Sequence, residues 1–213
     1  MALACLAAEA DHAGDKLARR GYALIDGSAV DLQQAVAAFD KLQGNSGEPL
    51  NISPGHPLIA ALLDQPAVAD LLREAVGPGG PGGPGGPGAP GARVVRGVAY
   101  DQQGHASWFV PWHQAGRDAE AAQRLILRWH LDLIGPADGG LRVLPGSHLR
   151  GRLPAEDVDR LAAEIPAVEL AVSAGTVLAL RPFLIQGARR RTTRGHRRIL
   201  QVELAPRVSQ PAA

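Results

Sequence analysis

Two histidines of the sequence have the surroundings of a metal ligand. One of them, His130, is followed by Asp132 in a His-x-Asp pair within residues 124–133. Side chains two positions apart on a strand point to the same face, so both could bind one metal ion. His148 or His196 would then be the third ligand. An ion pair carried by the strand explains the same spacing, so the spacing alone does not decide.

The other histidine, His113, lies in the run Pro-Trp-His-Gln-Ala. The first carboxylate that follows it is Asp118. An isolated histidine of this kind is more often a hydrogen-bonded structural residue than a metal ligand. The residues around His113 therefore do not indicate chemistry by themselves.

The strand expected over residues 124–133 has two very different faces. Its apolar face is expected to pack into the protein. Its polar face either meets solvent or lines the mouth of a polar cavity, and spacing does not choose between these alternatives. The apolar face carries Leu125, Leu127, Trp129, Leu131 and Leu133, and the other face carries Arg124, Ile126, Arg128, His130 and Asp132.

The elements that must position these residues are mostly short strands. Helices are expected over residues 10–20 and 155–164, and two more within 56–76, with a break near Gln65 and Pro66. Short strands separated by glycine and proline turns favour a sandwich or barrel with helices packed on one side. The expected strands are 21–27, 93–100, 107–112, 124–133, 141–144, 168–172, 176–180 and 198–204.

The sequence is expected to form one domain, 1–213, in four parts. Residues 1–76 are an N-terminal part of helices and a strand, 93–205 form the β core, and 206–213 are a tail. The intervening segment, 77–92, is a flexible loop rich in glycine and proline. Residues 77–91 have almost no apolar side chain to bury, so deleting most of them should leave the melting temperature nearly unchanged.

The composition favours a protein that binds small molecules. A formal net charge of +1 does not attract nucleic acid or an anionic membrane through bulk electrostatics. Cys5 is the single cysteine, which excludes an intramolecular disulfide and fits a reducing, cytoplasmic compartment. The first residues lack the basic region of a signal peptide, and no apolar run approaches the roughly 18 residues of a membrane-spanning helix. Nothing in the sequence indicates the oligomeric state.

A series of motifs carries a resemblance to a known family. The motifs are VPWHQA at 110–115, LRWHLD at 127–132, GGLRVLPGSH at 139–148, GTVL at 175–178, RPFLIQGA at 181–188 and RRILQVELA at 197–205. In this order they resemble bacterial phytanoyl-CoA dioxygenase-like proteins. The resemblance implies a mainly β fold with flanking helices, a double-stranded β-helix of the jelly-roll or cupin type. It also implies Fe(II), held by a His-x-Asp…His triad, and 2-oxoglutarate.

Carried onto this chain, the resemblance assigns the first iron ligand to His113. Ala115 stands where the family has aspartate, and Gln186 stands where it has the distal histidine. In this register His130 and Asp132 are not iron ligands. The resemblance implies that His113, Ala115, Gln186 and Arg197 converge at one cavity mouth. The cofactor-binding residues are expected to be Arg197, which would grip the distal carboxylate of 2-oxoglutarate, Gln114 and Arg128.

The resemblance leaves two main functions open. The first is an Fe(II)/2-oxoglutarate oxygenase that hydroxylates a small organic substrate. The second is a catalytically silent protein that binds a small molecule on the same fold, because one imidazole and a neutral amide bind Fe(II) more weakly than a full triad. A weaker alternative is a halogenase, since related halogenases have alanine or glycine in place of the aspartate. Those enzymes keep both histidines, however, which this chain does not.

Overall fold

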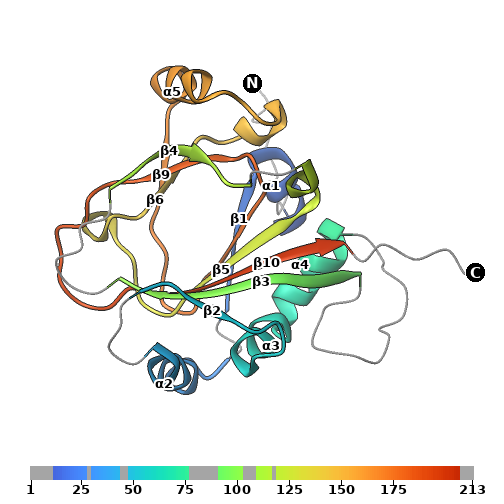
Figure 1. Cartoon of the computed structure of the whole chain (residues 1–213), viewed down its shortest axis with the longest axis vertical. Helices are drawn as coiled ribbons and strands as arrows, with labels where there is room; N and C mark the ends of the chain where they lie inside the picture. Colours follow the sequence, from blue (N-terminus) through green and yellow to red (C-terminus); the bar gives the residue numbers. More distant parts are fainter. Residues whose placement is uncertain are drawn as a thin grey trace, which may run out of the picture.

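Two antiparallel sheets face each other at the centre of the molecule (Figure 1). The computed structural model describes residues 12–27, 30–43, 48–76, 91–102, 109–116 and 119–206. Within these residues the larger sheet has six strands, in the order β1 (Tyr22–Ile25), β8 (Val177–Leu180), β5 (Leu125–His130), β10 (Arg198–Pro206), β3 (Ala92–Asp101) and β2 (Leu50–Ile52). Over the same residues the smaller sheet has four, in the order β4 (Val110–Gln114), β9 (Ile185–Ala188), β6 (Leu141–Val143) and β7 (Val168–Leu170).

The strands from β3 to β10 pair in a nested order. The first of them, β3, pairs with the last, β10, and β4 pairs with β9. Further inside the series, β5 pairs with β8, and β6 pairs with β7. Such nesting across two facing sheets defines a jelly-roll, or double-stranded β-helix. The predicted fold class is therefore confirmed, with β1 and β2 added at the two edges of the larger sheet.

The main hydrophobic core lies on the outer face of the larger sheet, beneath helices (Figure 1). Odd-numbered residues of β5, such as Leu127 and Trp129, are fully buried there. Trp129 also satisfies its indole nitrogen, because Nε1 donates to the Gly175 carbonyl at 3.1 Å. The helices that contribute to this core are α1 (Ala13–Arg20), α2 (Leu32–Gln43), α3 (Pro57–Leu63) and α4 (Pro66–Val76).

Two prolines explain why residues 56–76 form two helices. Pro57 opens α3 and Pro66 opens α4, at the end of a helix where a missing backbone N–H leaves no bond unmade. The side chain of His56 caps α3 by accepting a hydrogen bond from the backbone N–H of Leu58 at 3.2 Å. The predicted break near Gln65 and Pro66 is confirmed.

The smaller sheet is covered by one late helix, α5 (Ala155–Glu164), which has the predicted bounds. Its residues Val158 and Leu161 pack against Leu144 and Ile185 on the outer side of this sheet. Helices therefore cover the outer faces of both sheets, and only their inner faces border the space between them.

Several elements differ from the sequence prediction. Helix α2 and strands β2 and β9 were not expected from periodicity, and β5 ends at His130 instead of continuing to residue 133. Residues 77–90 of the predicted glycine- and proline-rich loop lie outside the described residues, so that prediction stays open, but Ala92 already belongs to β3. Among the described residues, no helix has the length and apolar character needed to cross a membrane.

Candidate functional site

A polar cavity lies between the two sheets. Even-numbered residues of β5 face this space: Ile126 joins a small apolar cluster, and Arg128 lines a cavity of about 200 Å³. Leu127 and Trp129 pack on the opposite face, so the predicted orientation of the strand is confirmed. The polar groups that line the cavity belong to Tyr100, Gln102, His113, Arg128, Gln186 and Arg197.

Two arginines of the larger sheet make the cavity cationic. Nε of Arg128 donates to Oε1 of Gln201 on the neighbouring strand, at 2.8 Å. Arg197 directly precedes β10, and its Nη1 donates to the Gly139 carbonyl at 2.9 Å. Burial lowers the pKa of both guanidinium groups, and that of Arg197, which also feels Arg128, falls to about 10. With a pKa of about 10, Arg197 keeps its positive charge at neutral pH.

The loop before Arg197 is fixed by backbone contacts. Gly139 adopts φ of +65°, and a Cβ there would come within 2.6 Å of the Arg189 carbonyl. Position 139, whose own carbonyl accepts the hydrogen bond from Arg197, therefore requires glycine. Nearby, Nη1 of Arg191 donates to the carbonyls of Gln102 and Gly195, at 2.8 and 3.0 Å. Arg191, one member of the basic run, therefore stabilises the loop.

Several buried polar atoms at the cavity have no hydrogen-bond partner among the described residues. They are Oε1 of Gln186 and Nε of Arg197, which belong to lining residues, and both ring nitrogens of His130, which lies next to the cavity and is not one of its lining residues. Leaving a buried donor or acceptor unmatched costs about 1–3 kcal/mol for each group. Evolved interiors avoid such costs unless another molecule provides the partner. A ligand bound in the cavity would provide partners for such atoms.

His130 is deeply buried, with 3% of its surface exposed. It lies on β5 directly opposite Ile199 of β10, and two positions from Arg128 on the same face. Burial, followed by the charges of Arg197 and Arg128, lowers the pKa of His130 to about 3. The ring is neutral at physiological pH and offers one donor and one acceptor.

The iron site expected from the family resemblance is incomplete. His113 and Gln186 lie opposite each other on β4 and β9, and with Arg197 they line the cavity as expected. Nδ1 of His113 is 2.9 Å from the Pro111 carbonyl, an arrangement that leaves Nε2 available. Ala115 instead packs against the apolar cluster between the sheets. The described residues contain no group of three His, Cys, Asp or Glu side chains that could hold a metal, so they do not fit a facial triad.

The side chain of Gln114, which was expected to bind the cofactor, makes three hydrogen bonds to the backbone. Its Nε2 donates to the carbonyls of Gly151 and Phe183, at 2.8 and 2.7 Å. Its Oε1 accepts from the backbone N–H of Leu153 at 2.8 Å. The amide therefore joins three distant backbone segments, and the side chain is not part of the cavity lining.

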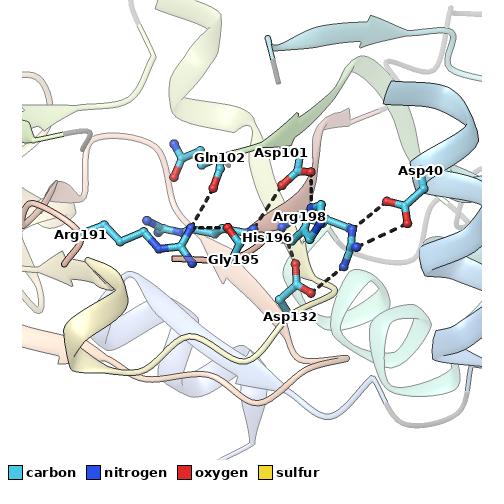
Figure 2. Close-up of polar contacts among 9 residues, drawn as sticks. Asp40, Asp101, Gln102, Asp132, Arg191, Gly195, His196 and Arg198 are labelled. Carbon is cyan, nitrogen blue, oxygen red and sulfur yellow. Dashed lines mark hydrogen bonds and ion pairs between the residues drawn. The ribbon is translucent and has the colours of Figure 1, made fainter. Parts of the chain in front are cut away.

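An ion-pair network surrounds the backbone at the start of β10 (Figure 2). Asp101 accepts from Nδ1 of His196 at 2.7 Å and from the backbone N–H of Arg197 at 3.2 Å. Asp132 accepts from the backbone N–H and Nη1 of Arg198, at 2.7 and 2.8 Å. These bonds fix the chain on both sides of the Arg197 side chain. The network consists of Asp40, Asp101, Asp132, His196 and Arg198, with Asp40 reaching Arg198 from α2.

The same contacts show that the alternative metal site on His130 and Asp132 is wrong. Because β5 ends at His130, Asp132 lies in the bend that follows and turns its carboxylate to Arg198. His148 points elsewhere, with Nε2 3.0 Å from the Ala18 carbonyl. His196, the other proposed third ligand, is paired with Asp101 in the ion-pair network, and only His130 faces the space between the sheets.

Comparison with known proteins decides the family. The sequence profile described as Phytanoyl-CoA dioxygenase (PhyH) matches residues 10–199, most of the chain. The chain belongs to the phytanoyl-CoA dioxygenase family. No curated protein has a significant sequence match to it.

Solved structures share the fold of this phytanoyl-CoA dioxygenase family member. AviO1 from Streptomyces viridochromogenes Tue57 is 21% identical, with 94% of this chain and 96% of that chain covered and a TM-score of 0.69. HygX from Streptomyces hygroscopicus, crystallised with nickel and 2-oxoglutarate, is 18% identical, with coverage of 89% and 84% and a TM-score of 0.68. EctD from S. alaskensis, in its apoform, is 18% identical, with coverage of 91% and 75% and a TM-score of 0.71.

Sequence reasoning missed two residues that line the cavity and one that supports it. Tyr100 and Gln102 line the cavity from β3 and the residue after it, and Gln201 holds Arg128. The signal was present in the period of two, because polar side chains recur at alternate positions in strands that are otherwise apolar.

Proposed function

We propose that this member of the phytanoyl-CoA dioxygenase family binds a small carboxylate of the 2-oxoglutarate class and does not by itself carry out iron-dependent oxygenation. The observation that supports the proposal is a cationic cavity, with orphaned polar atoms beside it, at an incomplete iron site. Its volume of about 200 Å³ is below the roughly 300–1,000 Å³ of sites for drug-sized ligands, which favours a ligand of few atoms.

Arg197 is the proposed anchor of the carboxylate. Its Nη1 is occupied by the Gly139 carbonyl, whereas its Nε has no partner among the described residues. A guanidinium group with a free N–H edge binds carboxylates through charge-assisted hydrogen bonds. The ion-pair network holds the backbone of Arg197, so the ligand meets a guanidinium that is already oriented. The relative HygX was crystallised with 2-oxoglutarate, which makes that acid the first ligand to try.

A second candidate is the family's own activity, the hydroxylation of a small organic substrate with Fe(II) and 2-oxoglutarate. One observation favours it: the hydrogen bond of His113 to Pro111 leaves Nε2 available, as in metal-binding histidines. The lack of a donor at Ala115 and the neutral amide at Gln186 weigh against it. A halogenase has less support still, because Gln186 replaces the second histidine.

Calorimetry separates the two candidates. The proposal predicts that 2-oxoglutarate binds the purified protein in the presence of EDTA, and that added Fe(II) leaves the affinity within about threefold, because Arg197 supplies the charge. Succinate should not form above background when iron, 2-oxoglutarate and air are supplied together. No heat of binding in EDTA would contradict the proposal, and steady succinate formation would favour the oxygenase.

A further inference from the structure

Positive charge is concentrated in the loop that joins β9 to β10. Six of the ten residues 189–198 are arginine, and none of the ten is acidic. The formal net charge of the whole chain is only +1, so the rest of the chain is net acidic. The loop therefore forms a local positive region on a protein with little net charge, and such a region attracts anionic partners.

Half of these arginines bind within the fold and half do not. Arg191 and Arg197 donate to backbone carbonyls, and Arg198 pairs with Asp132 (Figure 2). The other three are exposed, and none of their side chains forms a hydrogen bond or an ion pair with another described residue. They are Arg189, Arg190 and Arg194, the arginine patch. Exposed like charges without counter-charges favour contact with an anionic surface.

The backbone that carries the arginine patch is held in place. The backbone N–H and Oγ1 of Thr192 both donate to the Ala137 carbonyl, at 2.9 and 3.1 Å. Oγ1 of Thr193 donates to the carboxylate of Asp138. These bonds fix the middle of the loop against the turn at 135–139. A partner that binds the loop therefore loses less free energy in ordering it.

An exposed aromatic side chain lies beside the arginine patch. Val110 of β4 is opposite Ala188 of β9, so Phe109, one residue earlier, lies beside Arg189 in this antiparallel pair. Phe109 leaves 65% of its surface exposed. Protein interfaces are enriched in arginine and aromatic residues and depleted in lysine, and the loop 189–198 contains no lysine. The combination is typical of a protein-binding surface.

The shape of this surface favours a protein over a small molecule. None of the three arginines lines the cavity between the sheets or the three grooves found elsewhere among the described residues. Sites for small molecules are concave and enclose most of the ligand. The loop also lies beside the cavity, because Ala188 before it and Arg197 near its end both line that space. A protein docked on the loop would therefore sit next to the cavity.

We propose that the arginine patch and Phe109 dock an acidic protein surface, one that presents Asp or Glu carboxylates around an exposed apolar residue. The carboxylates pair with the guanidinium groups of the patch, and the apolar residue covers the ring of Phe109. The charges speed the encounter, and the apolar contact slows dissociation. This inference is independent of the proposed function, since docking needs no ligand in the cavity.

The test uses a fluorescent peptide of glutamates around a central leucine, and its binding is followed by anisotropy. The wild type should bind this peptide, and less tightly as the salt concentration rises. Changing all three arginines of the patch to glutamine should weaken binding about tenfold or more, because each exposed pair contributes a modest amount. Phe109→Ser should weaken it roughly threefold, and should have no effect on a peptide with serine in place of leucine.

The matched control removes the same charge from exposed positions outside the loop. It is the triple variant Arg73→Gln, Arg93→Gln, Arg150→Gln. This variant should bind the acidic peptide as the wild type does. Equal losses in the two triple variants would overturn the proposal, because binding would then follow net charge alone. A peptide with glutamine in place of every glutamate should not bind, and its binding with equal affinity would also overturn the proposal.

Two other probes test for a different occupant of the arginine patch. Inorganic diphosphate represents a phosphate ligand, and vesicles with anionic lipid represent a membrane surface. If either bound more tightly than the acidic peptide and lost its binding in the patch variant, the protein-docking proposal would be overturned. Failure of the wild type to bind the acidic peptide would also overturn it. If the patch variant does not fold, Arg190→Gln and Phe109→Ser decide in its place.

Discussion

The ion-pair network and the cavity, which meet at the start of β10, use charged residues in opposite ways. In the ion-pair network, each carboxylate meets a cation or a backbone N–H, as with Asp132 and Arg198. In the cavity, Arg128 and Arg197 line a common space with no carboxylate among the described lining residues. The first arrangement satisfies its own charges and stabilises the fold. The second leaves them for a ligand, although His196, Arg197 and Arg198 are neighbours in sequence.

This difference predicts that cavity variants change binding and network variants change stability. The largest effect is expected for Arg197→Met. Loss of one partner of a buried, hydrogen-bonded charge pair costs about 2–5 kcal/mol of binding free energy, so the dissociation constant for 2-oxoglutarate should rise about 30-fold or more. The melting temperature should change little, because the removal of a buried cation offsets the loss of the hydrogen bond to the Gly139 carbonyl. A large drop in melting temperature with intact binding would reverse the comparison.

Asp132→Ala should show the opposite pattern. The carboxylate accepts two hydrogen bonds from Arg198, and charged hydrogen bonds contribute about 1.5–3 kcal/mol each, so we expect a loss of about 2 kcal/mol or more in the free energy of unfolding. Binding of 2-oxoglutarate to the folded variant should weaken less than tenfold.

Asp157→Ala is the matched control for this change. Asp157 pairs with Arg160 on the exposed side of α5, where a salt bridge contributes about 0–1 kcal/mol. Chemical denaturation gives both values. Equal stability losses for the two aspartate variants would contradict the structural role of the network.

His130 offers a smaller effect with a defined pH dependence. Its pKa is about 3 in the folded protein and near 6.5 when unfolded, so the unfolded chain binds a proton that the folded chain does not. Protonation of His130 in the unfolded chain therefore does not lower the free energy of unfolding above pH 6.5, but lowers it progressively as the pH drops from 6.5 towards 3. His130→Leu should flatten this fall by about 1.4 kcal/mol per pH unit at most.

At pH 7 the same variant should be more stable than wild type by about 1–3 kcal/mol, because two orphaned polar atoms are removed, and it should bind 2-oxoglutarate more weakly. His196→Gln, with His130 intact, should keep the wild-type dependence on pH. Denaturant unfolding between pH 5 and 7 measures all three proteins. If His130→Leu proved less stable at pH 7, the ring would have a structural partner and would not be reserved for a ligand.

The sequence predicted the fold better than the site. The family resemblance led to the jelly-roll, whereas the short strands alone indicated a sandwich or barrel. Alternation in β5 gave the faces of Arg128 and Trp129 correctly, because local period and burial determine them. Asp132 was misplaced because alternation holds only within a strand, and β5 ends two residues earlier. The role of Gln114 depends on carbonyls of residues far along the chain, which no local pattern reveals.

The central claim is that this chain holds a carboxylate without a working iron site, and one spectroscopic titration tests it most directly. Fe(II) and 2-oxoglutarate are added anaerobically to the wild type and to the double variant Ala115→Asp, Gln186→His. The double variant regains a full triad with His113 and should show the metal-to-ligand charge-transfer band of the chelate. The wild type should bind 2-oxoglutarate and show no such band. A band of full strength in the wild type would contradict the claim.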